Sequence, residues 1–189
     1  GFCVVNDAVI AMRKLQSEGR IATAWVIDVD AHKGDGTAAL TSGDDSIVTL
    51  SVHMARGWPL DLPEFDSDGR RHPSYMESDL DVPVESGEEA TYVPALGAAL
   101  ADLARRPLPD IAYVLAGADP YEKDELPSTQ GLRLSLEQMH TRDMLVFETL
   151  KRLGVPQAWL MAGGYGEHAW EPYPGFLSYA LTHRPVVAR

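Results

Sequence analysis

The sequence predicts an α/β fold in which helices cover both faces of a mostly parallel sheet, giving three layers. Segments with the spacing of amphipathic helices alternate along the chain with short apolar runs. These runs are apolar throughout instead of alternating in polarity, which is typical of strands buried on both faces. The 189 residues, 45% of them hydrophobic, can bury one sizeable core. We therefore expect a single domain over residues 1–189.

Turn and capping residues place the elements in order. Strands are expected at 22–27, 46–52, 111–116 and 157–162, and helices at 6–19, 86–106, 135–154 and 174–183. Capping boxes open the second and third helices, formed by Ser86 with Glu89 and by Ser135 with Gln138. Pro94 is expected to kink the second helix. Residues 54–77 form the only long irregular stretch.

Composition narrows the classes of function. The formal net charge of -12 argues against a nucleic-acid partner, because a phosphate backbone is bound by clustered cations. An acidic surface suits basic partners instead. Cys3 is the single cysteine, so no disulfide framework and no cysteine zinc site can form. No apolar stretch is long enough to span a membrane and no signal sequence is visible, so we expect no membrane partner and a cytoplasmic location, or a nuclear one in a eukaryote.

The first residues suggest an interior piece of a longer chain. No Met begins the sequence, and Gly1–Cys3 lead directly into a helix that starts at Asn6 or Asp7, without a preceding strand. We therefore expect the N-terminal portion of the domain to lie outside this sequence.

Polar side chains follow the first predicted strand. Asp28, Asp30 and His32 occupy alternate positions, and alternate side chains of a strand share one face. Carboxylates and a neutral imidazole are ligands that zinc accepts, and a catalytic zinc site takes three protein ligands and keeps one position open. The plainer interpretation is a strand end in which an Asp caps the next helix and the His is solvated.

Three further strand ends carry residues that could join this group. They are Ser51-Val52-His53, Gly117-Ala118-Asp119 and the glycine turn around Tyr165. Ligands of open parallel sheets gather beyond the carboxyl ends of the strands. Each motif alone has an ordinary explanation, since Asp119 before Pro120 is a ready turn former. Their joint position favours one functional site.

These motifs together resemble the histone deacetylase family, of the arginase–deacetylase fold. The similar segments are 1–7, 28–36, 117–119 and 163–165, in the order found in the family. The segment 119–124 followed by 132–135 is more similar to bacterial and class IV members than to class I.

The resemblance implies a role for each matched residue. Asp30, His32 and Asp119 would ligate zinc, and Tyr165 would be the tyrosine that stabilises the transition state. Asp28 would hold a structural potassium ion, together with backbone carbonyls around Asp30, His32, Ser51 and Val52. The acyl-lysine tunnel would be lined by Phe2, Trp58 and Leu126, for which ordinary packing is an equally good interpretation.

The implied activity is zinc-dependent hydrolysis of an amide, which releases acetate and a free amine. A positive metal ion polarises the carbonyl and acidifies water, and the hydroxyl of Tyr165 can donate a hydrogen bond to the developing oxyanion. The substrate could be an acetylated lysine peptide, an acetylpolyamine or a small acetylated amine. Oligomeric state is left open.

Two departures from the family pattern matter. The adjacent histidines that serve the family as general base would lie before Gly1, and Lys33 stands where many members have a second histidine. A catalytically silent relative that binds acylated ligands is therefore an alternative. A binuclear manganese ureohydrolase is a weaker one, because its D-A-H-x-D motif is broken by Gly34.

Overall fold

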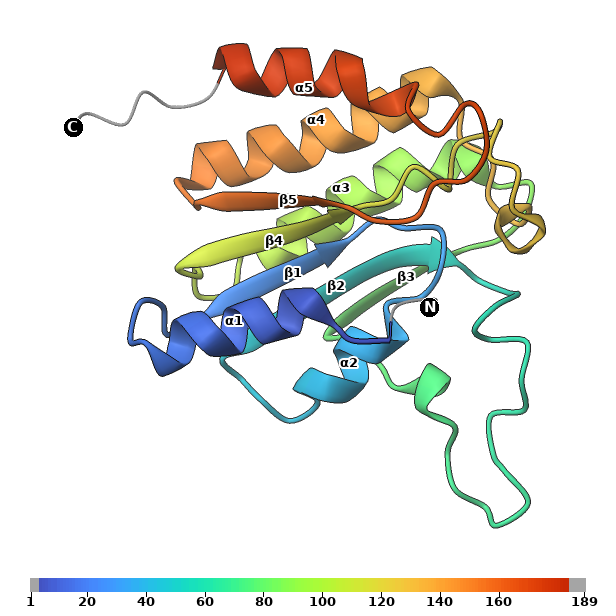
Figure 1. The fold of residues 1–189 in the computed structure, drawn as a ribbon, viewed down its shortest axis with the longest axis horizontal. Helices are drawn as coiled ribbons and strands as arrows, with labels where there is room; N and C mark the ends of the chain where they lie inside the picture. Colours follow the sequence, from blue (N-terminus) through green and yellow to red (C-terminus); the bar gives the residue numbers. More distant parts are fainter. Residues whose placement is uncertain (1–3, 184–189) are drawn as a thin grey trace.

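A computed structural model describes residues 4–183 and shows one sheet of five parallel strands. The strand order is β3-β2-β1-β4-β5 (Figure 1). The strands are β1 (Ala24–Asp28), β2 (Ile47–Met54), β3 (Leu80–Val84), β4 (Ile111–Ala116) and β5 (Gln157–Met161). Because all five run in the same direction, their carboxyl ends meet at one edge of the sheet.

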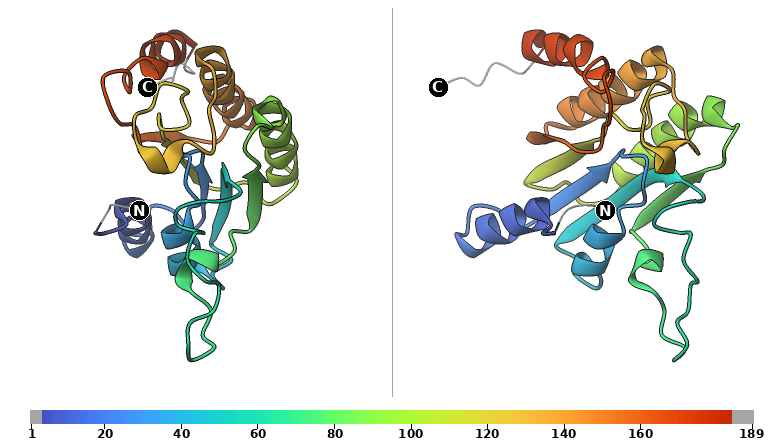
Figure 2. Two further views of the ribbon diagram at one scale, coloured as in Figure 1. Left: turned by 90° about the vertical axis from the view of Figure 1, so that its right-hand side faces the viewer. Right: turned by 45° about the vertical axis from the view of Figure 1, so that its right-hand side comes forward.

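Helices cover both faces of this sheet, so the α/β prediction is confirmed (Figures 1 and 2). On one face lie α1 (Asp7–Ser17) and α2 (Asp35–Thr41). On the other lie α3 (Tyr92–Leu103) and α4 (Leu136–Leu153), with α5 (Pro172–His183) packed against α4. Three short 3₁₀ helices complete the described part: η1 (Pro73–Tyr75), η2 (Glu89–Thr91) and η3 (Pro127–Thr129). Within it, no helix has both the length and the apolarity needed to cross a bilayer.

Each face of the sheet has its own apolar core. The larger core joins alternate residues of the strands, such as Trp25 and Ile27, to Leu96 of α3 and Val146 of α4. The smaller one packs Val26 and other strand residues of the opposite face against α1. This alternation explains why the strands are apolar throughout, because both sets of side chains are buried.

Two helix starts are confirmed in detail. Asn6 caps α1 by accepting a hydrogen bond from the amide of Val9 at 2.9 Å. Ser135 and Gln138 form the complete capping box of α4. Gly154 ends that helix with a φ of 70°, a left-handed conformation that glycine adopts without strain.

The predicted start of the helix between β3 and β4 is wrong. Glu89 turns back to accept a hydrogen bond from the amide of Gly87, and no capping box forms with Ser86. The chain instead makes the η2 turn, and α3 begins at Tyr92. Pro94 therefore falls in the first helical turn, where backbone amides have no partner within the helix, and its missing N–H disrupts nothing.

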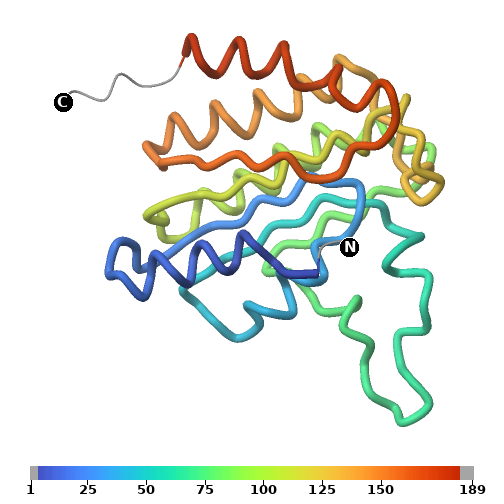
Figure 3. Tube along the Cα trace, in the orientation of Figure 1, coloured from blue at the N-terminus to red at the C-terminus, as the bar shows by residue number. Residues whose placement is uncertain are grey.

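One α-helix and one strand were not predicted. The α2 helix has only seven residues, includes a glycine and has no side-chain cap, so its sequence lacks the usual signals. Strand β3 contains Pro83, which is tolerated because β3 lies at the edge of the sheet. Between β2 and β3 the chain runs away from the sheet as a long loop that contains η1 (Figure 3).

Candidate metal centre

The candidate centre lies at the edge of the sheet where β1, β4 and β5 end. Asp30 and His32 lie in the turn after β1, Asp119 lies in the turn after β4, and Gly163 follows β5. Because β1 ends at Asp28, strand alternation does not continue through the motif. The group that forms consists of Asp30, His32 and Asp119. Asp28 lies behind this group, where its carboxylate accepts a hydrogen bond from the Asp30 amide at 3.0 Å.

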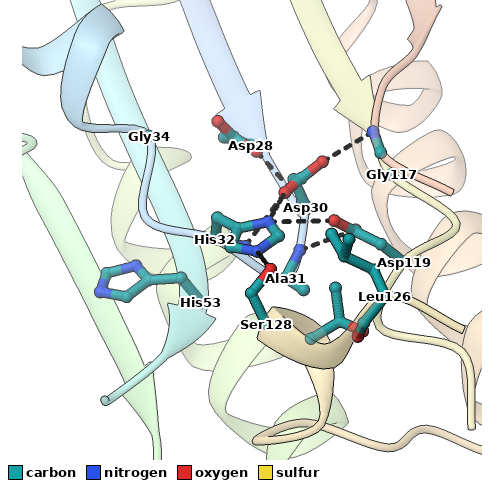
Figure 4. Close-up of polar contacts among 12 residues, drawn as sticks. Asp28, Asp30, Ala31, His32, Gly34, His53, Gly117, Asp119, Leu126 and Ser128 are labelled. Atoms are coloured by element: carbon teal, nitrogen blue, oxygen red, sulfur yellow. Dashed lines mark hydrogen bonds and ion pairs between the residues drawn. The ribbon is translucent and has the colours of Figure 1, made fainter. Parts of the chain in front are cut away.

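The three side chains face one another closely (Figure 4). His32 Nδ1 lies 3.1 Å from Asp30 Oδ1 and 3.1 Å from Asp119 Oδ2. One ligand atom from each residue can be chosen so that all three lie within 4.8 Å of one another. Asp119 is buried, with no exposed surface on its carboxylate.

Backbone amides orient both carboxylates. The Gly163 amide donates to Asp30 Oδ2 at 2.8 Å, and the Ala31 amide donates to Asp119 Oδ1 at 2.9 Å. Asp119 Oδ2 faces His32 and accepts no hydrogen bond from any other described group. When His32 Nδ1 carries no proton, this buried carboxylate oxygen has no donor, which is costly, and a metal ion would satisfy it.

Two glycines make room for the cluster. A Cβ at Gly117 would lie 2.6 Å from Asp30 Oδ2 and 2.7 Å from Asp119 Oδ1. A Cβ at Gly163 would collide with the same two carboxylates. Only glycine therefore allows the backbone of both turns to approach the carboxylates so closely.

The charges in the cluster are out of balance. Burial, with the neighbouring Asp30 charge, raises the pKa of Asp119 to about 7. Burial alone would lower the pKa of His32, but hydrogen bonds to Asp119 and Asp30 raise it to about 9. Burial and the Asp30 charge also raise the pKa of Asp28 well above its ordinary value. Excess negative charge in a buried, oxygen- and nitrogen-lined site fits a divalent cation such as zinc.

The ring of His32 is oriented by Ser128 in η3. His32 Nε2 lies 3.2 Å from Ser128 Oγ, which leaves Nδ1 turned toward the two carboxylates (Figure 4). If Nε2 carries the proton, Nδ1 keeps a lone pair for a metal. Nothing in the sequence marked Ser128, because 96 residues separate it from His32.

The predicted potassium ligands lie next to this cluster. Asp28 and Ser51 face each other in the β1–β2 register, and both are buried, as is Val52. Ser51 Oγ accepts a hydrogen bond from the Gly34 amide at 3.1 Å. A Cβ at Gly34 would lie 2.7 Å from Asp28 Oδ2, so the backbone passes close to the carboxylate. Asp28 and Ser51 thus lie on adjacent strands, and the potassium site with its carbonyl ligands stays a prediction.

Tyr165 is held at the other side of the site by the turn after β5. Its amide donates to Asp124 Oδ2 at 2.7 Å, and its carbonyl accepts from the Glu125 amide at 3.2 Å. Gly164 and Gly166 on either side have φ values of 150° and 93°. The turn therefore depends on two glycines and on the Asp124 carboxylate, which the sequence had not singled out.

A cavity of about 400 Å³ opens over the cluster. Asp30, His32, Trp58 and Tyr165 all line it. Leu126 is half-buried in the turn beside η3 and is not among the cavity residues, so its predicted tunnel role stays a prediction. Phe2 lies outside the described residues.

Two basic side chains near the site point elsewhere. Lys33 Nζ pairs with Asp81 Oδ2 on β3 at 2.5 Å. The ring of His53 also points away from the three clustered side chains (Figure 4). Burial and the charge of Lys33 lower the pKa of His53 to about 4, so it stays neutral near pH 7.

Comparison with known proteins identifies the family to which a chain with this fold and this cluster of side chains belongs. Residues 1–172 match the histone deacetylase domain. The chain belongs to the histone deacetylase family.

Individual relatives and a solved structure are similar to this chain in sequence or in fold. The chain is 31% identical to an uncharacterised protein of Picosynechococcus over 89% of its own length and 51% of that protein. It is 31% identical to the chloroplastic histone deacetylase 10 of Oryza sativa over 69% of this chain and 29% of the relative. The structure of acetylpolyamine aminohydrolase from Burkholderia pseudomallei superposes with a TM-score of 0.74 and 25% identity, over 94% of this chain and 50% of that one. The chain thus spans about half the length of the first and third of these proteins and less than a third of the second.

Proposed function

We propose that this chain forms the metal-binding part of a zinc-dependent deacetylase that hydrolyses the amide of an acylated amine. The observation that carries the proposal is the cluster of Asp30, His32 and Asp119 under a cavity that Tyr165 also lines. The family match and the similarity to acetylpolyamine aminohydrolase support an amide-hydrolysing reaction.

Asp30, His32 and Asp119 would hold the zinc. When bound, zinc polarises a carbonyl and acidifies water, which makes attack on an amide carbon possible at neutral pH. The residues of the chain supply the geometry: amides of Ala31 and Gly163 hold the carboxylates in place. Binding a cation also requires His32 to give up the proton that its carboxylate neighbours favour.

Tyr165 would act on the carbonyl oxygen. Tyr165 lines the same cavity as His32, and its backbone is anchored by Asp124 and Glu125. A phenol hydroxyl that donates to an oxygen as negative charge develops there stabilises the transition state more than the bound substrate.

The substrate class we propose is an acetylated cationic amine, such as acetyl-lysine in a peptide or an acetylpolyamine. The net charge of -12 favours the approach of a basic substrate. One structural neighbour is an acetylpolyamine aminohydrolase, and another is a histone deacetylase homologue in complex with SAHA, with a TM-score of 0.70 and 20% identity. The second similarity concerns the fold alone.

A catalytically silent acyl-binding protein is the second candidate. It is favoured by one observation: among residues 4–183, no histidine other than His32 lines the cavity. The ureohydrolase alternative is weakened further, because Gly34 occupies the position of a bridging ligand and Asp35 instead begins α2.

The proposal is tested by metal analysis and hydrolysis assays on the full-length protein. We expect about one zinc per chain and release of acetate from acetyl-lysine peptides or acetylpolyamines. Asp119→Ala should lose nearly all zinc, because it removes one of three ligands. Tyr165→Phe should keep the zinc and lower kcat on the order of a hundredfold with little change in KM.

The outcomes separate the candidates. Wild-type zinc content in Asp119→Ala would contradict the ligand assignment. Full zinc and tight binding of an acylated ligand without any acetate release would favour the silent binder over the enzyme.

A further inference from the structure

Arg142 is a fully buried cation on α4, behind the candidate metal centre. Its side chain has no exposed surface, which is rare for arginine. The charge is partly balanced by the adjacent Asp143, whose Oδ1 accepts from Arg142 Nε at 2.8 Å. A buried ion pair seldom adds stability by itself, so its other contacts decide what it does.

The same guanidinium joins the two turns that carry the carboxylate ligands. Arg142 Nη1 donates to the carbonyl of Val29 at 3.0 Å and to the carbonyl of Gly117 at 2.8 Å. Val29 directly precedes Asp30, and Gly117 lies two positions before Asp119. One nitrogen atom thus bridges the backbone of both turns.

Few other contacts join these turns within the described residues. The last backbone hydrogen bond between the β1 and β4 segments runs from the Val29 amide to the Leu115 carbonyl at 3.1 Å. Beyond it, the Ala31 amide reaches the Asp119 side chain. That second contact uses a presumed ligand, whereas the Arg142 bridge is independent of the ligand atoms.

We propose that Arg142 is a positioning residue that sets the spacing between Asp30 and Asp119 and thereby the affinity and geometry of the metal site. This inference rests on the proposed metal site and goes beyond it, because no ligand atom belongs to Arg142. The planar guanidinium bonds Asp143 through Nε while Nη1 bridges the two carbonyls. A lysine ammonium keeps the charge, but its single nitrogen cannot reproduce this fork.

The test compares Arg142→Lys with Tyr173→Phe in the full-length protein. Tyr173 is a matched control, because its hydroxyl donates at 3.2 Å to the carbonyl of Ala116, beside Gly117, but joins only one of the turns. Zinc affinity is measured by competition with a chelator, and the absorption spectrum of the cobalt-substituted protein reports the ligand geometry. Neither readout requires catalytic activity.

We expect Arg142→Lys to weaken zinc binding by about 10- to 100-fold and to change the cobalt spectrum, as loss of outer contacts to metal ligands commonly does. Tyr173→Phe should stay within about threefold of the wild-type affinity and keep its spectrum, since the two turns remain joined. A folded Arg142→Lys protein with wild-type affinity and spectrum would overturn the proposal.

A second variant covers the case in which Arg142→Lys does not fold. Arg142→Met combined with Asp143→Leu removes both charges, and apolar replacement of a whole buried pair is often tolerated. It should show the same loss of zinc affinity. Failure of both variants to fold would show a purely structural role and overturn the proposal. A wild-type protein that binds no zinc would overturn the metal site itself.

Discussion

At the scale of single residues, the centre depends on groups that touch the ligands as much as on the ligands. Asp119 keeps one oxygen for the Ala31 amide and turns the other toward His32. Gly117 and Gly163 leave space that any side chain would fill. The carboxylates are therefore held ready by the backbone, which lowers the cost of ordering them when a metal binds.

Ser128 offers a test of how His32 is held. Ser128→Ala removes the partner of Nε2, so the ring can adopt the tautomer or orientation that withdraws Nδ1 from the metal. We expect zinc affinity to fall by about tenfold, while the unfolding free energy of the metal-free protein changes by less than about 1 kcal/mol. Chelator competition and chemical denaturation measure the two quantities. Unchanged zinc affinity would show that Ser128 does not orient the ring.

Asp28 separates the two proposed cation sites. Asp28→Asn should leave zinc content largely intact, because Asp28 lies outside the cluster of three ligands. It should remove a stabilisation by potassium that the wild-type protein shows, since a ligand that binds the folded state raises its stability. Thermal melting in potassium and in a large organic cation compares the two proteins. Zinc loss as complete as in Asp119→Ala would make Asp28 a direct zinc ligand.

At the scale of elements, the turn after β5 is tied to the turn after β4. Asp124 accepts from the Tyr165 amide, and Glu171 accepts from the hydroxyl of Tyr121 and from Lys123 at 2.6 and 2.9 Å. His168 Nδ1 also lies 2.7 Å from Glu171. Two carboxylates therefore hold the segment that carries Tyr165: Asp124, in the turn after β4, and Glu171, in the segment itself.

These contacts predict an acid-sensitive part of the stability. Hydrogen bonds from Tyr121, Lys123 and His168 lower the pKa of Glu171 from its ordinary 4.5 to about 2. A lowered carboxyl pKa stabilises the fold above about pH 4.5, and this contribution is lost as the pH falls toward 2. Glu171→Gln should therefore be less stable than wild type at pH 7, with a difference that shrinks below pH 4.5.

Denaturant unfolding between pH 3 and pH 7 measures that difference. Glu167→Gln is the matched control, because Glu167 is an exposed carboxylate of the same turn. Its difference from wild type should not vary in this way. A Glu171→Gln difference that is independent of pH would show that the hydrogen bonds do not depend on the charge of Glu171.

Sequence signals predicted long elements better than short ones. The capping box of α4 involves residues that are close in the chain, so it could be recognised directly. The Ser86 and Glu89 pair has the same spacing, but Glu89 bonds Gly87 instead and helix α3 starts later. Strand β3 was missed because its pairing with β2, not its own sequence, makes it a strand.

At the scale of the whole molecule, the cavity is lined by Tyr165, Asp30 and His32, but by no second histidine among the described residues that could accept a proton. His53 points away, Lys33 is paired with Asp81, and His72 accepts from the Ser74 amide in the long loop. The resemblance to the histone deacetylases implies a histidine pair that this sequence does not contain.

We therefore predict a large difference in rate between this chain and the longer protein of its family type. The 189-residue chain, loaded with zinc, should hydrolyse an acetyl-lysine peptide at least about a hundredfold more slowly than a longer form that contains the histidine pair implied by the resemblance, because general base catalysis supplies a factor of that order. Steady-state assays at matched zinc content measure the ratio. Equal rates would show that the base lies among these residues.

The sequence by itself determined the α/β class and the positions of the presumed ligands in strand-end turns. Apolar runs that alternate with helices require a parallel sheet, and a parallel sheet brings Asp30, Asp119 and Tyr165 to one edge. Only the tertiary structure decided that Ser128 orients His32, that Asp124 anchors Tyr165 and that Arg142 bridges the ligand turns. Those contacts span 96, 41 and up to 113 residues, and no local pattern encodes a hydrogen bond whose partners meet only after the chain has folded.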